Sequence, residues 1–137
     1  MRAGQFAYSS SKLCNVMTAR ELARRIANSR PDLMIAAFDP GFTPGTGLAR
    51  QYGAVVSTLF RFVLPLVIRG GRVSTPLNSG TKLAALATDS AYADARGTYY
   101  AVRGPVMNAV EPSDLARDEA AAARLWDDSA GMVGLSK

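Results

Sequence analysis

Two short apolar runs constrain the fold of this 137-residue chain more than any other feature. The first, Leu33–Phe38, reads LMIAAF and lies between Pro31 and a loop rich in proline and glycine. The second, Thr98–Val102, reads TYYAV and follows Gly97. Continuous apolar runs of this length predict strands, and the first is typical of a fully buried strand in a parallel sheet. Because helical patterns surround both runs, the order of elements indicates an α/β protein.

Helices are predicted around these strands. Apolar residues recur at helical spacing from about Tyr8 to Asn28, and Pro31 ends the pattern. A second helix is predicted over Pro76–Asp89, and a last one from Ser113, a favourable N-cap, to near Ala130. A short helix and an apolar helical segment are expected at 46–52 and 59–68, between the first strand and the helix at Pro76–Asp89. Two strands are too few for a parallel sheet covered on both faces, so the pattern indicates the trailing edge of a larger sheet.

The composition excludes several classes of site. The chain has no histidine, which rules out Ser-His-Asp catalysis, Cys-His catalysis and histidine-containing metal sites. Its single cysteine, Cys14, cannot form an internal disulfide or a cysteine-rich zinc site, so no metal site is expected. We interpret this thiol as a small buried hydrophobe. One cysteine is compatible with a reducing compartment, and we expect the protein to be cytoplasmic.

The net charge of +5 does not by itself indicate a nucleic-acid partner. Arginines cluster between positions 20 and 30, but they do not form a basic stripe with interleaved aromatic residues. Glu21 lies four residues before Arg25, a favourable pair on a helix. We therefore interpret the cluster as a solvated helix face and expect no nucleic acid to bind.

The most apolar stretch, Val55–Ile68, does not predict a membrane span. It is short for that purpose and contains Arg61 and Pro65. A role at a membrane surface stays open as an alternative, because Arg69 and Arg72 follow the apolar stretch closely.

Tyr8 and Lys12, in the sequence YSSSK, are candidates for proton transfer. Residues four apart share one face of a helix, so both side chains can point into one pocket. A phenol has a reference pKa near ~10, and acid–base work near neutral pH requires a fall of up to about three units, or about 4 kcal/mol. An ammonium ~4 Å away supplies about 1 kcal/mol in water and about 4 at an effective dielectric constant of ~20. The chemistry therefore requires a partly dry pocket.

Three segments resemble the short-chain dehydrogenase/reductase family. YSSSKLCNVMTARELARR is similar to the active-site helix of its protochlorophyllide reductase and retinol dehydrogenase-like branch. DPGFTPGTGLAR resembles the Pro-Gly loop, and AAARLWDDSAGMVGLSK resembles the C-terminal helix. The resemblance implies one partial domain over residues 1–137, the C-terminal portion of a Rossmann-like doubly wound parallel sheet with about two strands and four to five helices. Because only seven residues precede Tyr8, we expect the N-terminal nucleotide-binding half to be absent from this chain.

The resemblance also implies an oxidoreductase that transfers hydride between NAD or NADP and a carbonyl, an alcohol or an activated C=C bond. Tyr8 would be the proton donor or acceptor. Lys12 would hydrogen-bond the nicotinamide ribose and favour the ionised phenol. Pro40 and Gly41 would pass under the nicotinamide, with the Thr43 backbone near its carboxamide. The branch favours NADP over NAD.

The Pro-Gly loop departs from the family pattern at one position. A threonine usually follows the Pro-Gly pair after three residues, but here Gly45 stands there and Thr46 comes next, so Thr46 is the expected substitute. Gly41, Gly45 and Gly47 also match the G-x-x-x-G-x-G spacing of a phosphate-binding turn. We interpret them as the Pro-Gly loop, because the segment follows the tyrosine and two prolines restrict the turn.

The partners expected from the sequence are a small apolar organic substrate and a second copy of the chain. The apolar residues of Leu48–Ile68 would wall the substrate pocket. The predicted helix Tyr8–Asn28 offers a face for a homo-oligomer. The competing hypothesis is a truncated, non-catalytic remnant that cannot bind dinucleotide alone, and we expect this chain by itself to be inactive.

Overall fold

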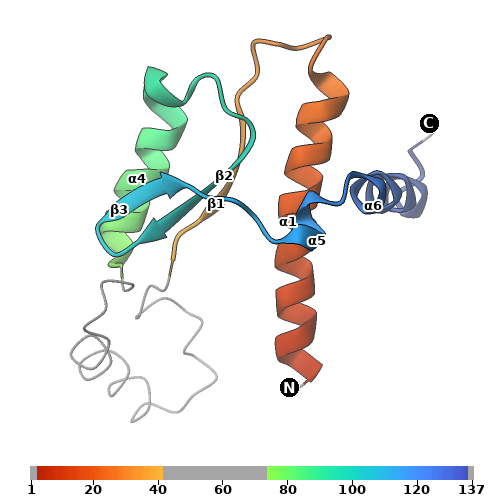
Figure 1. Ribbon diagram of the computed structural model, residues 1–137, viewed down its shortest axis with the longest axis horizontal. Coiled ribbons are helices and arrows are strands. Elements are labelled where there is room, and N and C mark those ends of the chain that lie inside the picture. The colour runs from red at the N-terminus through yellow and green to blue at the C-terminus, as the bar shows by residue number, and fades with distance from the viewer. Residues whose placement is uncertain (1–2, 42–73, 136–137) are drawn as a thin grey trace. The chain divides into compact units, whose positions relative to one another are not determined.

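The computed structural model describes residues 3–41 and 74–135. In chain order the elements are α1 (Ala3–Ile26), β1 (Ile35–Asp39), α4 (Pro76–Thr88), the short 3-10 helix η2 (Ser90–Tyr92), β2 (Arg96–Arg103), β3 (Val106–Ala109), α5 (Asp114–Arg117) and α6 (Glu119–Met132) (Figure 1). The α/β class and the partial Rossmann-like fold predicted from the sequence are confirmed. The segments expected at 46–52 and 59–68 lie outside the described residues.

The chain divides into two compact units. The first unit combines Met1–Ala37, Ala93–Tyr99 and Val110–Lys137, and it contains α1, α5 and α6. The second unit combines Phe38–Tyr92 and Tyr100–Ala109, and it contains α4, η2 and β3. Strands β1 and β2 contribute residues to both units.

The strands form a mixed sheet in the order β1-β2-β3. Strands β1 and β2 are parallel, as predicted. Strand β3 was not predicted; it pairs antiparallel with β2, with Arg103 opposite Val106. Gly104 and Pro105 make the two-residue connection, and Gly104 has a φ of +62°. A glycine at the first central position is typical of the tight turns that join hairpin strands.

Strand β1 confirms the predicted strand at Leu33–Phe38, shifted by one or two residues. All five of its residues are half-buried, so the expectation of a fully buried strand was wrong. The reason is the position of β1 at the edge of the sheet, since only β2 lies beside it among the described strands. Central parallel strands are covered on both sides, whereas an edge strand keeps part of its surface in water.

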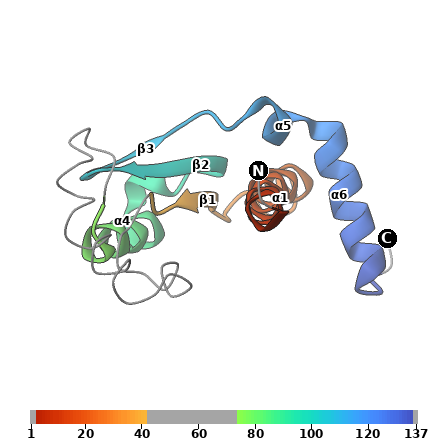
Figure 2. The ribbon, with the colours of Figure 1, turned by 90° about the horizontal axis from the view of Figure 1, so that it is seen from below.

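The core of the first unit lies where α5 and α6 pack against α1. Met17, Ala116 and Ala122 are buried there. Four half-buried apolar residues pack around them: Leu13, Val16, Ala121 and Leu125. Figure 2 looks along α1 and shows α5 and α6 beside it. Because alanine contributes little volume, the two buried alanines let the helix backbones approach one another closely.

The helix predicted from Ser113 to near Ala130 is divided into α5 and α6. Ser113 is the N-cap of α5, as predicted, and its side chain accepts a hydrogen bond from the backbone N–H of Ala116. Asp118 ends α5 and caps α6, with its Oδ1 accepting from the N–H of Ala121 at 2.9 Å. A short acidic side chain that bonds the following backbone N–H groups favours a new helix start over continuation of the old helix.

Helices α1 and α4 confirm the two predicted helices, with the ends of α1 shifted. Helix α1 begins five residues earlier than predicted and ends at Ile26, where the N–H of Arg30 donates to the Ile26 carbonyl at 2.8 Å. Helix α4 starts at Pro76, as predicted, after Thr75, whose hydroxyl oxygen accepts from the Asn78 N–H at 3.1 Å. A threonine N-cap followed by proline at the first helical position is a strong helix start.

Candidate active site

Tyr8 and Lys12 lie together on α1, one helical turn apart. The Lys12 ammonium nitrogen Nζ is 5.5 Å from the centre of the Tyr8 ring. Tyr8 is 51% exposed, and Lys12 is exposed as well. A phenol that can donate or accept a proton therefore shares an open helix face with a cation. The described residues do not form the dry pocket around this pair that the chemistry requires, so water screens the charge.

The second half of the predicted site is the loop at the end of β1. The backbone N–H of Gly41 donates to Asp39 Oδ1 at 2.9 Å, and Arg103 Nη1 donates to Asp39 Oδ2 at 2.8 Å. Gly41 has a φ of +72°, and a Cβ atom there would lie 2.3 Å from the Val102 carbonyl oxygen. Only glycine fits this position, because any side chain would overlap the β2 backbone. The backbone at Pro40 and Gly41 is therefore held closely against the sheet.

The structure places the predicted site residues in two groups. Tyr8 and Lys12 belong to the first unit, whereas Pro40 and Gly41 belong to the second. Each pair is brought together within its own unit. Thr43 and Thr46, and the predicted substrate wall at 48–68, lie outside the described residues.

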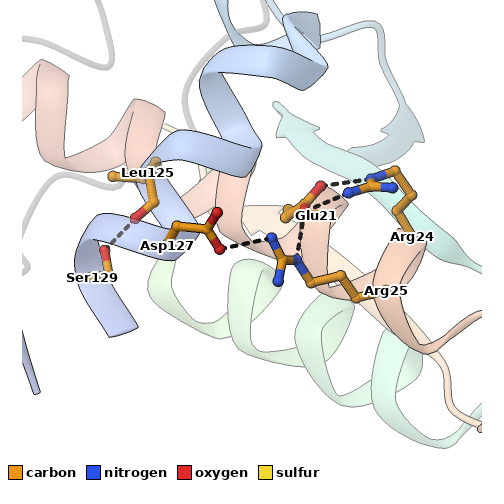
Figure 3. Close-up of polar contacts among 6 residues, drawn as sticks. All are labelled: Glu21, Arg24, Arg25, Leu125, Asp127 and Ser129. Atoms are coloured by element: carbon orange, nitrogen blue, oxygen red, sulfur yellow. Dashed lines mark hydrogen bonds and ion pairs between the residues drawn. The ribbon is translucent and has the colours of Figure 1, made fainter. Parts of the chain in front are cut away.

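A buried glutamate on α1 is a feature that the sequence analysis did not identify. Glu21 is 2% exposed. Its carboxylate accepts two hydrogen bonds from Arg24, at 2.8 and 2.7 Å, and one from Arg25 Nε at 2.6 Å (Figure 3). Arg25 Nη2 also donates to Asp127 Oδ1 on α6 at 3.2 Å. The Arg25 guanidinium carbon lies 5.2 Å from the centre of the Trp126 ring, so one arginine ties α1 to α6 through both contacts.

The arginine hydrogen bonds change the acidity of Glu21. The bonds from Arg24 and then Arg25 stabilise the carboxylate and outweigh its desolvation, so the pKa of Glu21 falls from 4.5 to about 2. Glu21 is therefore ionised at any pH near neutrality, and it acts as a structural anion in this helix pair. A proton-transfer role for it would require the opposite shift.

The structure refines one interpretation from the sequence and corrects another. The side chains of Arg24 and Arg30 in the arginine-rich cluster are exposed, as interpreted, but Arg24 and Arg25 also share a buried carboxylate, and Arg25 reaches α6. A signal was present in the sequence: Leu13, Met17 and Glu21 follow at four-residue spacing, so Glu21 continues the buried stripe of the helix. Cys14 is half-buried and not fully buried as expected.

A groove of about 280 Å³ lies in the first unit beside Glu21. Arg20, Arg96 and Arg117 line it, together with Glu21 and Glu119. Because charges of both signs are interspersed, the groove does not present the one-signed field that selects an anion or a cation.

Two kinds of feature are absent from residues 3–41 and 74–135. No group of three or more His, Cys, Asp or Glu side chains in these ranges could hold a metal ion. Within the same ranges, no helix combines the length and the hydropathy that crossing a membrane requires.

The chain has relatives among known proteins, although no protein-family model matches it. It is 31% identical over 136 residues to a chloroplastic protochlorophyllide reductase of Chlamydomonas reinhardtii, which covers 97% of this chain and 33% of the relative. It is 31% identical over 147 residues to the short-chain dehydrogenase iccH of Talaromyces variabilis, and the match covers 100% of this chain and 39% of the relative. It is 34% identical over 134 residues to retinol dehydrogenase 13 of Homo sapiens, and the match covers 94% of this chain and 37% of the relative. The chain thus spans between 33% and 39% of the length of these relatives.

Proposed function

The chain belongs to the short-chain dehydrogenase/reductase family, and we propose that it carries the proton-transfer half of an oxidoreductase site. The reaction is the transfer of a hydride between a nicotinamide dinucleotide and a carbonyl, an alcohol or an activated C=C bond. Tyr8 is the proton donor or acceptor, and Lys12 supports it. The observation that carries this proposal is the shared helix face of Tyr8 and Lys12, with the ammonium 5.5 Å from the ring centre.

Tyr8 and Lys12 have different roles at the reacting oxygen atom of the substrate. In the reducing direction the Tyr8 hydroxyl donates its proton to the developing alkoxide, and in the oxidising direction the phenolate accepts the alcohol proton. Lys12 stabilises the phenolate by its positive charge, an interaction that strengthens when water is excluded around the pair. Removal of a positioned general acid typically lowers the rate by about 10²- to 10⁴-fold.

Two features, one in each unit, support a nicotinamide dinucleotide as the proposed cofactor. The Tyr8 hydroxyl and the Lys12 ammonium offer hydrogen-bond partners to ribose hydroxyl groups from one helix face. Gly41 offers a backbone surface without a side chain, held in place by Asp39. When bound, the nicotinamide supplies or accepts the hydride. The likeness to protochlorophyllide reductases favours NADP as the dinucleotide.

The substrate that we propose is a small, apolar organic molecule. Two relatives are named for protochlorophyllide and for retinol, the second of which is an alcohol. Such molecules are held mainly by apolar contacts, with few polar groups to orient the reacting bond.

The proposal is tested by a Tyr8→Phe variant, which removes the phenol and keeps the ring. The oxidation of NADPH is followed by absorbance with a panel of apolar aldehydes and ketones. We expect Tyr8→Phe to lower the rate at least about 100-fold. Tyr92→Phe is the matched control, because it removes a phenol in the second unit and keeps the ring that contacts Tyr100. Equal, measurable rates in wild type and Tyr8→Phe would contradict the role of Tyr8, whereas the absence of turnover in wild type would agree with the expectation that this chain by itself is inactive.

A further inference from the structure

Three polar side chains meet at the start of α4 within the second unit, one from Ser74 before the helix and two from its first turns. Ser79 is 6% exposed, and its hydroxyl donates to the Pro40 carbonyl at 2.8 Å. Its oxygen lies 3.0 Å from Ser74 Oγ, which is also buried. Asn78 Nδ2 donates both to Ser74 Oγ at 2.9 Å and to the Gly104 carbonyl at 3.0 Å. The start of α4 is thereby bonded to the loop after β1 and to the β2–β3 turn.

Residues of the sheet hold the Pro40–Gly41 loop by a second set of contacts. Asp39 accepts from the Gly41 N–H at 2.9 Å, and Arg103 donates to the second oxygen of Asp39 at 2.8 Å. Gly41 lies so close to Val102 that no side chain fits between them. The Pro40–Gly41 peptide is therefore fixed at its carbonyl by Ser79 and at its N–H by Asp39.

We propose that Ser79 is a positioning residue that fixes the Pro40–Gly41 loop in the conformation that binds the nicotinamide. The inference rests on the proposed function, in which this loop passes under the nicotinamide ring. Ser74 helps to orient the Ser79 hydroxyl, because the two buried hydroxyl oxygens lie 3.0 Å apart and Asn78 holds Ser74 in place by a hydrogen bond. A loop that is ordered before binding loses little conformational entropy when the cofactor binds. The affinity for the cofactor is therefore higher than with a disordered loop.

The first arm of the test measures the loop without any cofactor. Hydrogen exchange of the Gly41 amide is followed by NMR in wild type, Ser79→Ala and Thr81→Ala. Loss of one hydrogen bond of ordinary net strength corresponds to about five-fold faster exchange, which we expect in Ser79→Ala. Thr81→Ala is the control, because the Thr81 hydroxyl donates to the Leu77 carbonyl of its own helix. Ser79→Thr keeps the hydroxyl and is expected to restore slow exchange.

The second arm titrates NADPH into the same variants and follows its fluorescence. We expect Ser79→Ala to raise the dissociation constant about five-fold and Thr81→Ala to leave it unchanged. Equal Gly41 exchange in Ser79→Ala and wild type would overturn the proposal, as would faster exchange with an unchanged dissociation constant. If wild type binds no NADPH, the proposed function fails, while the exchange arm still decides whether Ser79 holds the loop.

Discussion

Replacing Glu21 by glutamine should remove a large part of the stability that joins α1 to α6. The pKa of Glu21 falls from 4.5 to about 2 on folding, because Arg24 and Arg25 stabilise the carboxylate. Each pKa unit corresponds to about 1.4 kcal/mol, so ionisation of this group contributes about 3 kcal/mol at neutral pH. A neutral amide can still accept one arginine hydrogen bond, but its NH₂ group faces a second donor. We therefore expect Glu21→Gln to lower the free energy of unfolding by about 2 to 3 kcal/mol at pH 7.

The direction of the pKa shift of Glu21 determines how the stability loss in Glu21→Gln depends on pH. The folded-state pKa lies below the unfolded value, so the contribution is complete above about pH 5 and disappears as the pH falls towards 2. The difference between wild type and Glu21→Gln should therefore shrink to less than about half by pH 3. An acid-induced change of this kind cannot arise from packing alone, because packing does not titrate in this range.

Urea unfolding followed by the fluorescence of Trp126 measures both quantities. Trp126 is the single tryptophan of the chain, and its ring lies beside Arg25. Glu111→Gln is the matched control: the Glu111 side chain is 84% exposed and lies 3.8 Å from Arg117, so we expect an effect below about 0.5 kcal/mol. A Glu21→Gln variant as stable as this control at pH 7 would refute the reasoning. A difference that persists unchanged at pH 3 would refute it as well.

Three further predictions concern backbone positions, and urea unfolding measures each of them. Gly41→Ala should destabilise the chain by about 2 kcal/mol or more, because its Cβ would overlap the Val102 carbonyl at a positive φ. Gly80→Ala should stabilise it by about 0.5 to 1 kcal/mol, because Gly80 lies inside α4 with open space around it. Asp118→Ala should cost about 1 kcal/mol, because the N–H of Ala121 loses its cap. Shifts of opposite sign would contradict the respective arguments.

Local signals in the sequence predicted the elements whose causes are local. The helical pattern predicted the start of α4 at Pro76, and the Ser113 N-cap located α5. The four-residue spacing of Tyr8 and Lys12 predicted correctly that they share a helix face, because helix geometry alone decides that. The break at Asp118 was also local, but a strong helical pattern on both sides concealed it.

The features that sequence reasoning missed depend on residues far apart in the chain. The contact between Arg25 and Asp127 joins positions separated by 102 residues, and no local pattern specifies it. The bond from Ser79 to Pro40 likewise requires α4 to return to the end of β1. Strand β3, Val106–Ala109, has four residues, a run too short to predict a strand by itself.

The titration of NADPH and NADH into the purified chain, with cofactor fluorescence as the signal, tests the central claim most directly. We expect saturable binding, even though the chain by itself is expected to be catalytically inactive. Lys12→Ala should weaken this binding, and Lys82→Ala, on α4, should leave it unchanged. Binding of this kind would mean that Tyr8 and Lys12 belong to a working nucleotide site. No binding of either dinucleotide at millimolar concentration would contradict the claim, and it would favour the non-catalytic remnant.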